Sequence, residues 1–533
     1  MRAYWNILSV IFLFSLVWRL SARGQQENGV KTHYAISDPK GAATIVAKVG
    51  PIDITAQQFL LSYEFGPAFP KRQSDSKRRY LDFMINEKLL ALDGYSRGLQ
   101  RSDRVVASVA EIEGDLATEE LYKDDVLSKV RVTEGEIDEA MHGEHVHRSF
   151  HWLYTKTRDE IQHAESLLHT GVPFDSLFKL QVRDSSAREE RSMETTLFKL
   201  RRQAPALAAV VDTLIPGAPS APIHGPDGWY IVYIVDGWND PLTTESENFK
   251  LRSDVERALI QQKSDSLSDQ YVRRMMLNHD PVIVRRTFDL LRAWLGSKVL
   301  PPEKFSSWEL ARRFEEESDS VDLAHIDRYG KETLVTLNRG SISLRDFLVW
   351  YRAREFYVHL GISSPQSFFV SIEQLVWRMV RDKLLLERAM KRNLQHRKFV
   401  KTQKKWWEEK ILYELAKSDL SNSIALDTQT LRDYYEERSR NYRNEKGEPV
   451  PFERAKDDVR KDLYSFELTK RLLHRILILK RKYPIEVRER TLRDLPVDTE
   501  NQPKAVDVYA VKKGGIFPRP AFPTIDYQWH TWD

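Results

Sequence analysis

Apolar positions near the start of the chain follow a short extended run and then helical stripes. Residues 45–49 (Ile-Val-Ala-Lys-Val) form a β-like run that Gly50-Pro51 closes. Thr55 stands where a helix N-cap is expected, ahead of apolar residues at helical spacing. A second helix is predicted from Ser76, and its apolar stripe stops at Gly98. The pattern therefore predicts a strand followed by amphipathic helices with a charged outer face.

The same pattern returns later in the chain at a nearly constant offset. Lys88 corresponds to Lys383, 295 residues further on, and Ser343 repeats the expected helix cap. Near the end of the pattern Phe249 corresponds to Phe452, and there the offset is only 203 residues. The chain therefore reads as two related helical copies. The first copy contains a domain-sized insert between roughly His145 and Asn239.

The insert differs in character from the helical copies around it. Residues 150–154 and 228–236 are strand-like, with alternating or continuous apolar side chains. Between them, residues 158–169, 174–180 and 207–214 are predicted helices. The order β-α-α-α-β predicts a small sheet covered by helices.

The predicted fold class is α+β and mostly helical, with two related helical domains of which the first is interrupted by the β-α-β insert. The predicted divisions, in chain order, are a signal peptide (1–24), the N-terminal part of the first helical copy (44–144), the insert (145–240), the C-terminal helix and strand of the first copy (241–287), a linker with some helix of its own (288–331), a second copy without an insert (332–490), and an extended tail with aromatic and proline residues (491–533).

Composition and the N-terminal residues indicate the compartment. Arg2, an apolar run over residues 7–18 and small residues up to Gly24 are typical of a secretory signal, with cleavage expected after Ala22 or Gly24. The alternative is an uncleaved membrane anchor. The chain has no cysteine, which excludes disulfides and thiol chemistry. We expect a secreted protein stabilised by packing alone, and a periplasmic location fits best.

Five motifs follow one another in the insert: His151-Trp-Leu153, Gly171-Val-Pro-Phe174, Asp184-Ser-Ser-Ala187, Leu214-Ile-Pro-Gly217 with Ser220-Ala-Pro-Ile223, and Gly228-Trp-Tyr-Ile-Val232. Together they resemble the parvulin-type (PpiC-like) peptidyl-prolyl isomerases and the SurA and PrsA group of secreted folding chaperones. The flanking copies resemble the SurA-like helical chaperone domain that such isomerase modules interrupt. The resemblance covers most of residues 44–287 and, more weakly, 332–490.

The resemblance implies a site for the insert. His151, Asp184 and Tyr230 are the catalytic candidates, and Gln203, Leu207 and Trp229 are the candidates for binding substrate. Tyr230 stands where the family has a second histidine and Leu207 where it has a pocket phenylalanine, so weak or absent isomerase activity is expected. No cofactor or metal is expected, because the histidines from His142 to His151 lack a carboxylate-bearing motif.

The expected function is that of a folding chaperone for unfolded or extended polypeptides, especially envelope and outer-membrane proteins. A net charge of +4 does not call for nucleic acid, and no phosphate-binding loop indicates ATP. An active isomerase and an envelope scaffold for one folded partner are the alternatives. The basic stretch 378–410 either contacts anionic lipid or an acidic client, or forms a solvated helix face. The aromatic tail from Phe517 either covers an apolar groove on its own chain or serves a partner.

Overall fold

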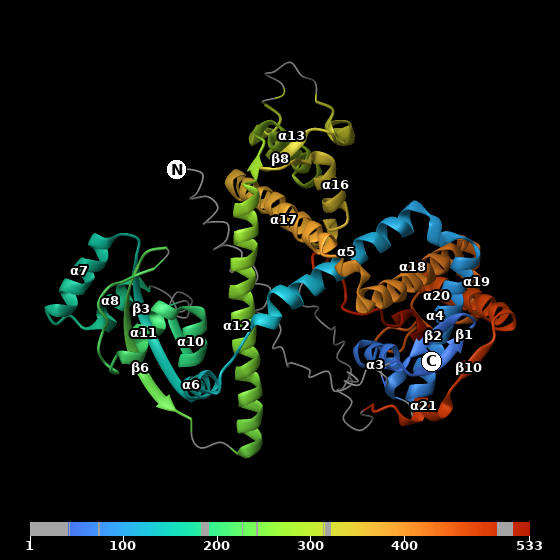
Figure 1. The fold of residues 1–533 in the computed structure, drawn as a ribbon, viewed down its shortest axis with the longest axis horizontal. Coiled ribbons are helices and arrows are strands. Elements are labelled where there is room, and N and C mark those ends of the chain that lie inside the picture. Colours follow the sequence, from blue (N-terminus) through green and yellow to red (C-terminus); the bar gives the residue numbers. More distant parts are fainter. Residues whose placement is uncertain are drawn as a thin grey trace. The chain divides into compact units, whose positions relative to one another are not determined.

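The computed structural model describes residues 41, 43–72, 75–182, 191–225, 227–240, 244–312, 314, 321–497 and 515–532. These residues are mostly helical with small antiparallel sheets, as the predicted fold class requires (Figure 1). The chain divides into two compact units. Unit 1 comprises the residues up to Asp125 and those from Val272 onward, and unit 2 runs from Val126 to Tyr271. The predicted signal peptide lies outside the described residues.

Unit 1 contains most of the helices. Its elements are β1 (Ile45–Val49), β2 (Ile52–Thr55), α3 (Ala56–Phe65), α4 (Ser76–Ser96), α5 (Asp103–Asp125), β7 (Val282–Ile283), α13 (Arg285–Val299), α14 (Pro302–Ser307), β8 (Thr333–Thr336), β9 (Ser341–Ser343), α16 (Leu344–Arg352), α17 (Pro365–Lys391), α18 (Lys398–Asn422), α19 (Thr428–Glu437), α20 (Phe452–Lys482), β10 (Ile485–Val487) and α21 (Glu489–Asp494). In the described part of the chain, no helix combines the length and the apolar character that crossing a membrane requires.

Two three-stranded antiparallel sheets in unit 1 join distant parts of the chain. The first has the order β10-β1-β2, with Ala47 opposite Val487. The second has the order β7-β8-β9, with Ile283 opposite Val335. Each sheet therefore takes its hairpin from the start of one predicted copy and its third strand from the end of the other. We call these two sheets the crossed sheets.

Helix ends follow the predicted signals in both halves of unit 1. Thr55 caps α3 and Ser343 caps α16, each through a capping box with the residue three positions later. Gly98 after α4 and Asn393 after α17 both adopt left-handed backbone conformations, with φ of 74° and 58°. Glycine and asparagine are the residues that tolerate this conformation best, so both helices stop there.

The helices of unit 1 interleave. Helix α18 packs against α4 and α5, and α17 packs against α5. Gly94 permits a close approach, because a Cβ atom there would lie 3.1 Å from the Cβ atom of Leu412. Opposite charges meet where α18 packs against α5: Arg397 pairs with Asp124 at 2.6 Å, and Lys404 pairs with Glu113 at 3.0 Å. The basic stretch 378–410 thus directs part of its charge onto the acidic helix α5.

The predicted linker, residues 288–331, contributes to the core. Helix α13 buries Phe288, Leu290, Leu291 and Leu295, all at most 4% exposed. The sequence predicts a linker for this segment because Pro301-Pro302 and the acidic run after them interrupt the apolar pattern. In the structure these prolines only end α13 and begin α14.

Unit 2 contains a four-stranded antiparallel sheet with the order β4-β3-β6-β5. Its elements are α6 (Glu134–His145), β3 (Val146–Thr155), α7 (Arg158–His169), α8 (Phe174–Gln181), β4 (Ser192–Thr196), α10 (Leu197–Gln203), α11 (Pro205–Thr213), β5 (Ile223–His224), β6 (Trp229–Asn239) and α12 (Glu245–His279), the last of which extends past Tyr271. The two predicted strands, which are the central strands β3 and β6, and the three predicted helices are present. Strands β4 and β5 were not predicted, because each is short and lacks an apolar run.

Candidate functional site

The predicted isomerase residues lie on two different faces of the unit 2 sheet. Residues directly opposite each other on neighbouring antiparallel strands share a face. His151 of β3 lies opposite Tyr233 of β6, whereas Tyr154 lies opposite Tyr230. Because successive side chains on a strand alternate between faces, His151 and Tyr230 point to opposite sides of the sheet.

Helices α7 and α8 cover the face that carries His151. The His151 ring stacks on Phe178 with the ring centroids 4.6 Å apart, next to Leu153 and Ile231 in the same apolar cluster. Trp229 packs against this cluster too, and its ring lies 4.7 Å from that of His224. His151 and Trp229 are therefore on one side of the sheet, in a setting dominated by aromatic packing.

Helices α10 and α11 cover the face that carries Tyr230. Leu207 packs against the apolar cluster on this face, and Gln203 ends α10. The Tyr230 hydroxyl donates a hydrogen bond to Asp227 Oδ1 at 2.6 Å. Burial, together with this hydrogen bond, raises the pKa of Tyr230 above its usual range. On β3, the positions that share this face are those of the aromatic residues Trp152 and Tyr154.

The structure thus places Tyr230 and Leu207 on one side of the sheet and His151 and Trp229 on the other. Asp184 lies outside the described residues. Among the described residues, no group of three or more His, Asp or Glu side chains is arranged to hold a metal ion. The roles assigned to these six residues stay predictions. Tyr230, which stands where the family has its second histidine, points to the opposite face of the sheet from His151.

A second candidate site, which we did not predict from the sequence, lies in unit 1 where the tail of the chain is bound. We call Pro523–Trp529 the anchor. Trp529 is fully buried, and its ring lies 5.7 Å from that of Phe83 and 6.1 Å from that of Tyr413. Its indole N–H donates to Glu87 Oε1 at 3.0 Å. The interpretation that the aromatic tail covers a groove on its own chain is therefore confirmed.

The part of the tail before the anchor, Gly515–Phe522, is mostly half-buried and irregular, with bends at 516–517 and 521–522, and we call it the strap. Asp115 Oδ1 accepts hydrogen bonds from the backbone N–H groups of Ile516 and Phe517, at 2.6 and 2.7 Å. The guanidinium group of Arg519 pairs with Asp115 at 2.7 Å and with Glu119 at 2.6 Å. All three charged side chains are at most 9% exposed. Helix α5 thus binds the backbone of the strap and also Arg519, the one basic side chain of the strap.

Arg354, which follows α16, holds the strap from another side. It donates to the backbone carbonyl of Ile516 at 3.0 Å and to Glu111 Oε1 at 2.9 Å. Its guanidinium group also lies 5.1 Å from the centre of the Phe517 ring, within the range of a cation–π contact. Charged side chains therefore bind the backbone of the strap, which any polypeptide offers, and Arg354 also contacts one aromatic ring.

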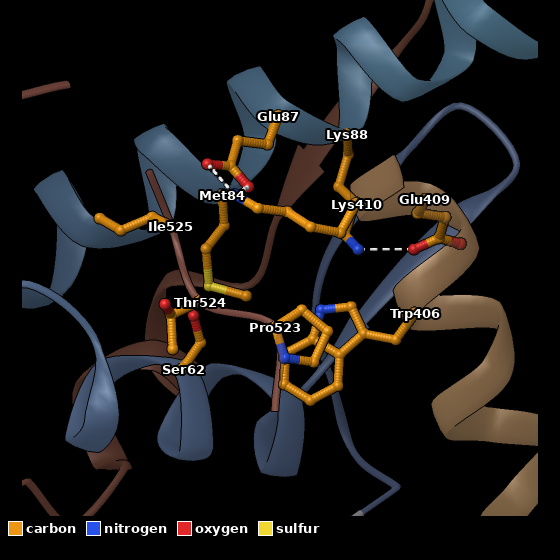
Figure 2. A pocket seen from close by; sticks show the side chains of 10 residues that line it. All are labelled: Ser62, Met84, Glu87, Lys88, Trp406, Glu409, Lys410, Pro523, Thr524 and Ile525. Carbon is orange, nitrogen blue, oxygen red and sulfur yellow. Dashed lines mark hydrogen bonds and ion pairs between the residues drawn. The ribbon is translucent and has the colours of Figure 1, made fainter. Parts of the chain in front are cut away.

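Buried ion pairs lie beneath the anchor (Figure 2). Lys88 Nζ lies 2.5 Å from Glu409 Oε2, and Lys410 Nζ lies 3.0 Å from Glu87 Oε2. Burial raises the pKa of Glu87, although Lys410 and the indole N–H of Trp529 act in the opposite direction. The cavity between these pairs, Trp406 and the anchor has a volume of about 20 Å³, enough for one water molecule.

A larger groove runs beside the strap and the anchor. Its volume is about 410 Å³, and it is lined by Phe65, Gly66, Pro67, Trp407, Lys410, Glu414, Pro520 and Phe522 to Tyr527. Phe522 stacks between Phe65 and Trp406, at centroid distances of 6.1 and 6.4 Å. The strap therefore forms one wall of the groove.

A sequence signal for this second site does exist. Asp115 and Glu119 lie three and seven residues after Ile112, so both occupy the apolar stripe of α5 rather than its charged back. Glu87 and Lys88 similarly interrupt the apolar run from Met84 to Leu92. Charged residues at apolar-stripe positions need buried partners. The sequence does not show that these partners come from the other end of the chain.

Comparisons with known proteins find matches among solved structures, all at low identity and low TM-score. No protein-family model matches the chain, and no curated protein matches it. Among solved structures, PrsA from Bacillus subtilis is 17% identical, with 43% of this chain and 93% of that chain covered and a TM-score of 0.16. The peptidylprolyl isomerase PrsA from Bacillus anthracis is 13% identical, with 45% of this chain and 99% of that chain covered and a TM-score of 0.20. The foldase protein PrsA from Streptococcus pneumoniae is 14% identical, with 42% and 87% covered and a TM-score of 0.20. Each of these solved structures aligns with less than half of this chain.

Proposed function

We propose that this protein is a secreted, periplasmic folding chaperone that binds unfolded or extended polypeptides, including envelope proteins, and that unit 2 is a parvulin-like module with weak or no isomerase activity. The helical body would consist of two related copies, the first interrupted by the module. The order of elements supports this division, because β1-β2-α3-α4-α5-α6 and then α12-β7 run in the same order as β8-β9-α16-α17-α18-α19-α20-β10.

The observation that carries the chaperone proposal is an exposed apolar segment in unit 1. Between α16 and α17, Phe356 is 93% exposed and Tyr357 is 60% exposed. Ile362 on the same connection is 44% exposed, and Val349 near the end of α16 is exposed too. Isolated exposed apolar residues are common, but three on one connection are typical of an interaction surface. We call residues 355–362 the exposed loop.

Suppression of aggregation tests the chaperone proposal. The double variant Phe356→Ser/Tyr357→Ser should need about five- to tenfold more protein than the wild type to prevent aggregation of several unrelated unfolded proteins, since each lost aromatic contact costs about 1 kcal/mol or less. Light scattering of the diluted clients measures this ratio. Phe249→Ser, which removes an exposed phenylalanine elsewhere on the chain, is the matched control and should behave like the wild type.

Two results would contradict the chaperone proposal. The first is equal suppression by the loop variant and the wild type. The second is binding to a single native protein without any suppression, which would favour the scaffold alternative. The melting temperature of both variants should equal that of the wild type, because the substituted side chains are largely exposed.

An active isomerase is the alternative, and a protease-coupled assay with a proline peptide tests it. We expect a rate within about threefold of the uncatalysed one, since His151 and Tyr230 lie on opposite faces of the sheet and cannot act together on a barrier of about 20 kcal/mol. His151→Ala and Tyr230→Phe should both leave this rate unchanged, because the two side chains lie on opposite faces of the sheet. Substantial turnover that either substitution abolishes would show that unit 2 is an enzyme.

A further inference from the structure

The strap is bound like a peptide to a surface that includes Asp115, Glu119 and Arg354, which we call the strap groove and which adjoins the larger groove described above. The contacts of the strap differ in kind from those of the anchor. The anchor inserts Ile525 and Trp529 into the main apolar core of unit 1. The strap places no side chain in that core, and charged groups make its closest contacts. Water can replace contacts with charged groups at less cost than contacts in an apolar core. The strap can therefore leave while the anchor stays folded.

The groove selects for features that a client polypeptide would share with the strap. Asp115 and Arg354 bind the backbone N–H and C=O groups of residues 516 and 517, which any extended chain offers. Arg354 contacts the ring of Phe517, and Phe65 and Trp406 contact the ring of Phe522. Between these rings, Asp115 and Glu119 together provide two negative charges for a single cation.

We propose that the groove occupied by the strap is a binding site for clients, and that its ligand is an extended segment with an arginine between aromatic or proline residues. The proposal rests on the proposed chaperone function and names the class of segment that it recognises. The strap, Gly-Ile-Phe-Pro-Arg-Pro-Ala-Phe, is then an internal competitor. A client gains the site only when the strap leaves it.

Competition by the strap explains how the site can be tested. A ligand tethered to its own site acts at an effective concentration on the order of millimolar. A free peptide at micromolar concentration therefore competes poorly with an intact strap. A substitution that weakens the strap should raise the apparent affinity of the free peptide, because more of the protein then has an open groove.

The experiment measures fluorescence anisotropy of a labelled synthetic peptide of residues 515–522 with the full chain. We expect the strap variants Arg519→Ala and Phe517→Ser to bind the peptide about tenfold more tightly than the wild type. The peptide supplies its own arginine to Asp115, so Arg519→Ala does not remove the recognised group from the ligand. Phe517→Ser leaves no buried charge without a partner and serves if Arg519→Ala fails to fold. Arg490→Ala, which removes a side chain that is 94% exposed, is the control and should match the wild type.

The double variant Asp115→Asn/Phe517→Ser tests whether the labelled peptide binds at Asp115. This pair should return the peptide affinity to the wild-type level or below, and a peptide with alanine in place of arginine should bind the strap variants about tenfold more weakly. The proposal is overturned if folded strap variants bind the peptide no better than the wild type, or if the gain persists with Asp115→Asn. Aggregation suppression, measured in parallel, separates the two ideas: normal suppression without a gain in peptide affinity sinks only the groove, whereas a gain without any suppression sinks only the chaperone function.

Discussion

Replacing Trp529 by alanine should lower the free energy of unfolding by about 3–5 kcal/mol, the range for removing a fully buried tryptophan. The indole is in contact with Phe83 and Tyr413, in the core that also contains β1 and β2. Its loss would leave a cavity and would leave Glu87 without one of its hydrogen-bond donors. Urea unfolding of the full chain, followed by far-ultraviolet circular dichroism, measures the change.

Two further variants show which part of the Trp529 effect comes from packing. Trp529→Phe keeps a ring but loses the N–H group, so it should cost less than Trp529→Ala. Tyr527, in the same turn, is 60% exposed, so Tyr527→Ala should change the free energy of unfolding by less than about 1 kcal/mol. A cost below about 1 kcal/mol for Trp529→Ala would show that the anchor is not part of the core.

Replacing Lys88 by methionine should lower the free energy of unfolding by a similar amount, about 3–5 kcal/mol. The side chains of Lys88 and Glu409 are 6% and 3% exposed, so removing the lysine leaves a carboxylate buried without its cation. The double variant Lys88→Met/Glu409→Leu should recover most of the loss, because an apolar pair of similar volume avoids the desolvation of both charges.

An exposed ion pair provides the comparison for Lys88. The side chains of Lys461 and Asp458 are 76% and 70% exposed, and Lys461→Met should change stability by at most about 1 kcal/mol. Chemical denaturation at constant ionic strength measures all the variants. If Lys88→Met costs no more than Lys461→Met, then water reaches Glu409 and the pair is not buried in solution.

Local structure was the part of this fold that the sequence predicted well. The caps at Thr55 and Ser343 and the helix stop at Gly98 depend on a few neighbouring residues, whose backbone preferences act in the same way in any fold. The apolar stripes of the helices and the strands β3 and β6 of unit 2 follow from the same kind of local periodicity.

Partners distant in sequence were the part that the sequence could not predict. Periodicity shows which side of a strand is buried but not which strand lies beside it, so the crossed sheets were not foreseen. The same limit applies to His151 and Tyr230. Their relative faces depend on the register between β3 and β6, which shifts at a bulge between Ser149 and Phe150.

The crossed sheets also constrain the order in which the chain can fold. Strand β1 is made near the start of synthesis, but its partner β10 emerges only after almost the whole chain has been made. Until then the outer edge of β1 has no neighbouring strand and can pair with other extended chains. Pairing between segments so distant in sequence is also slow to form. A protein proposed to protect unfolded chains therefore passes through the same exposed state during its own folding.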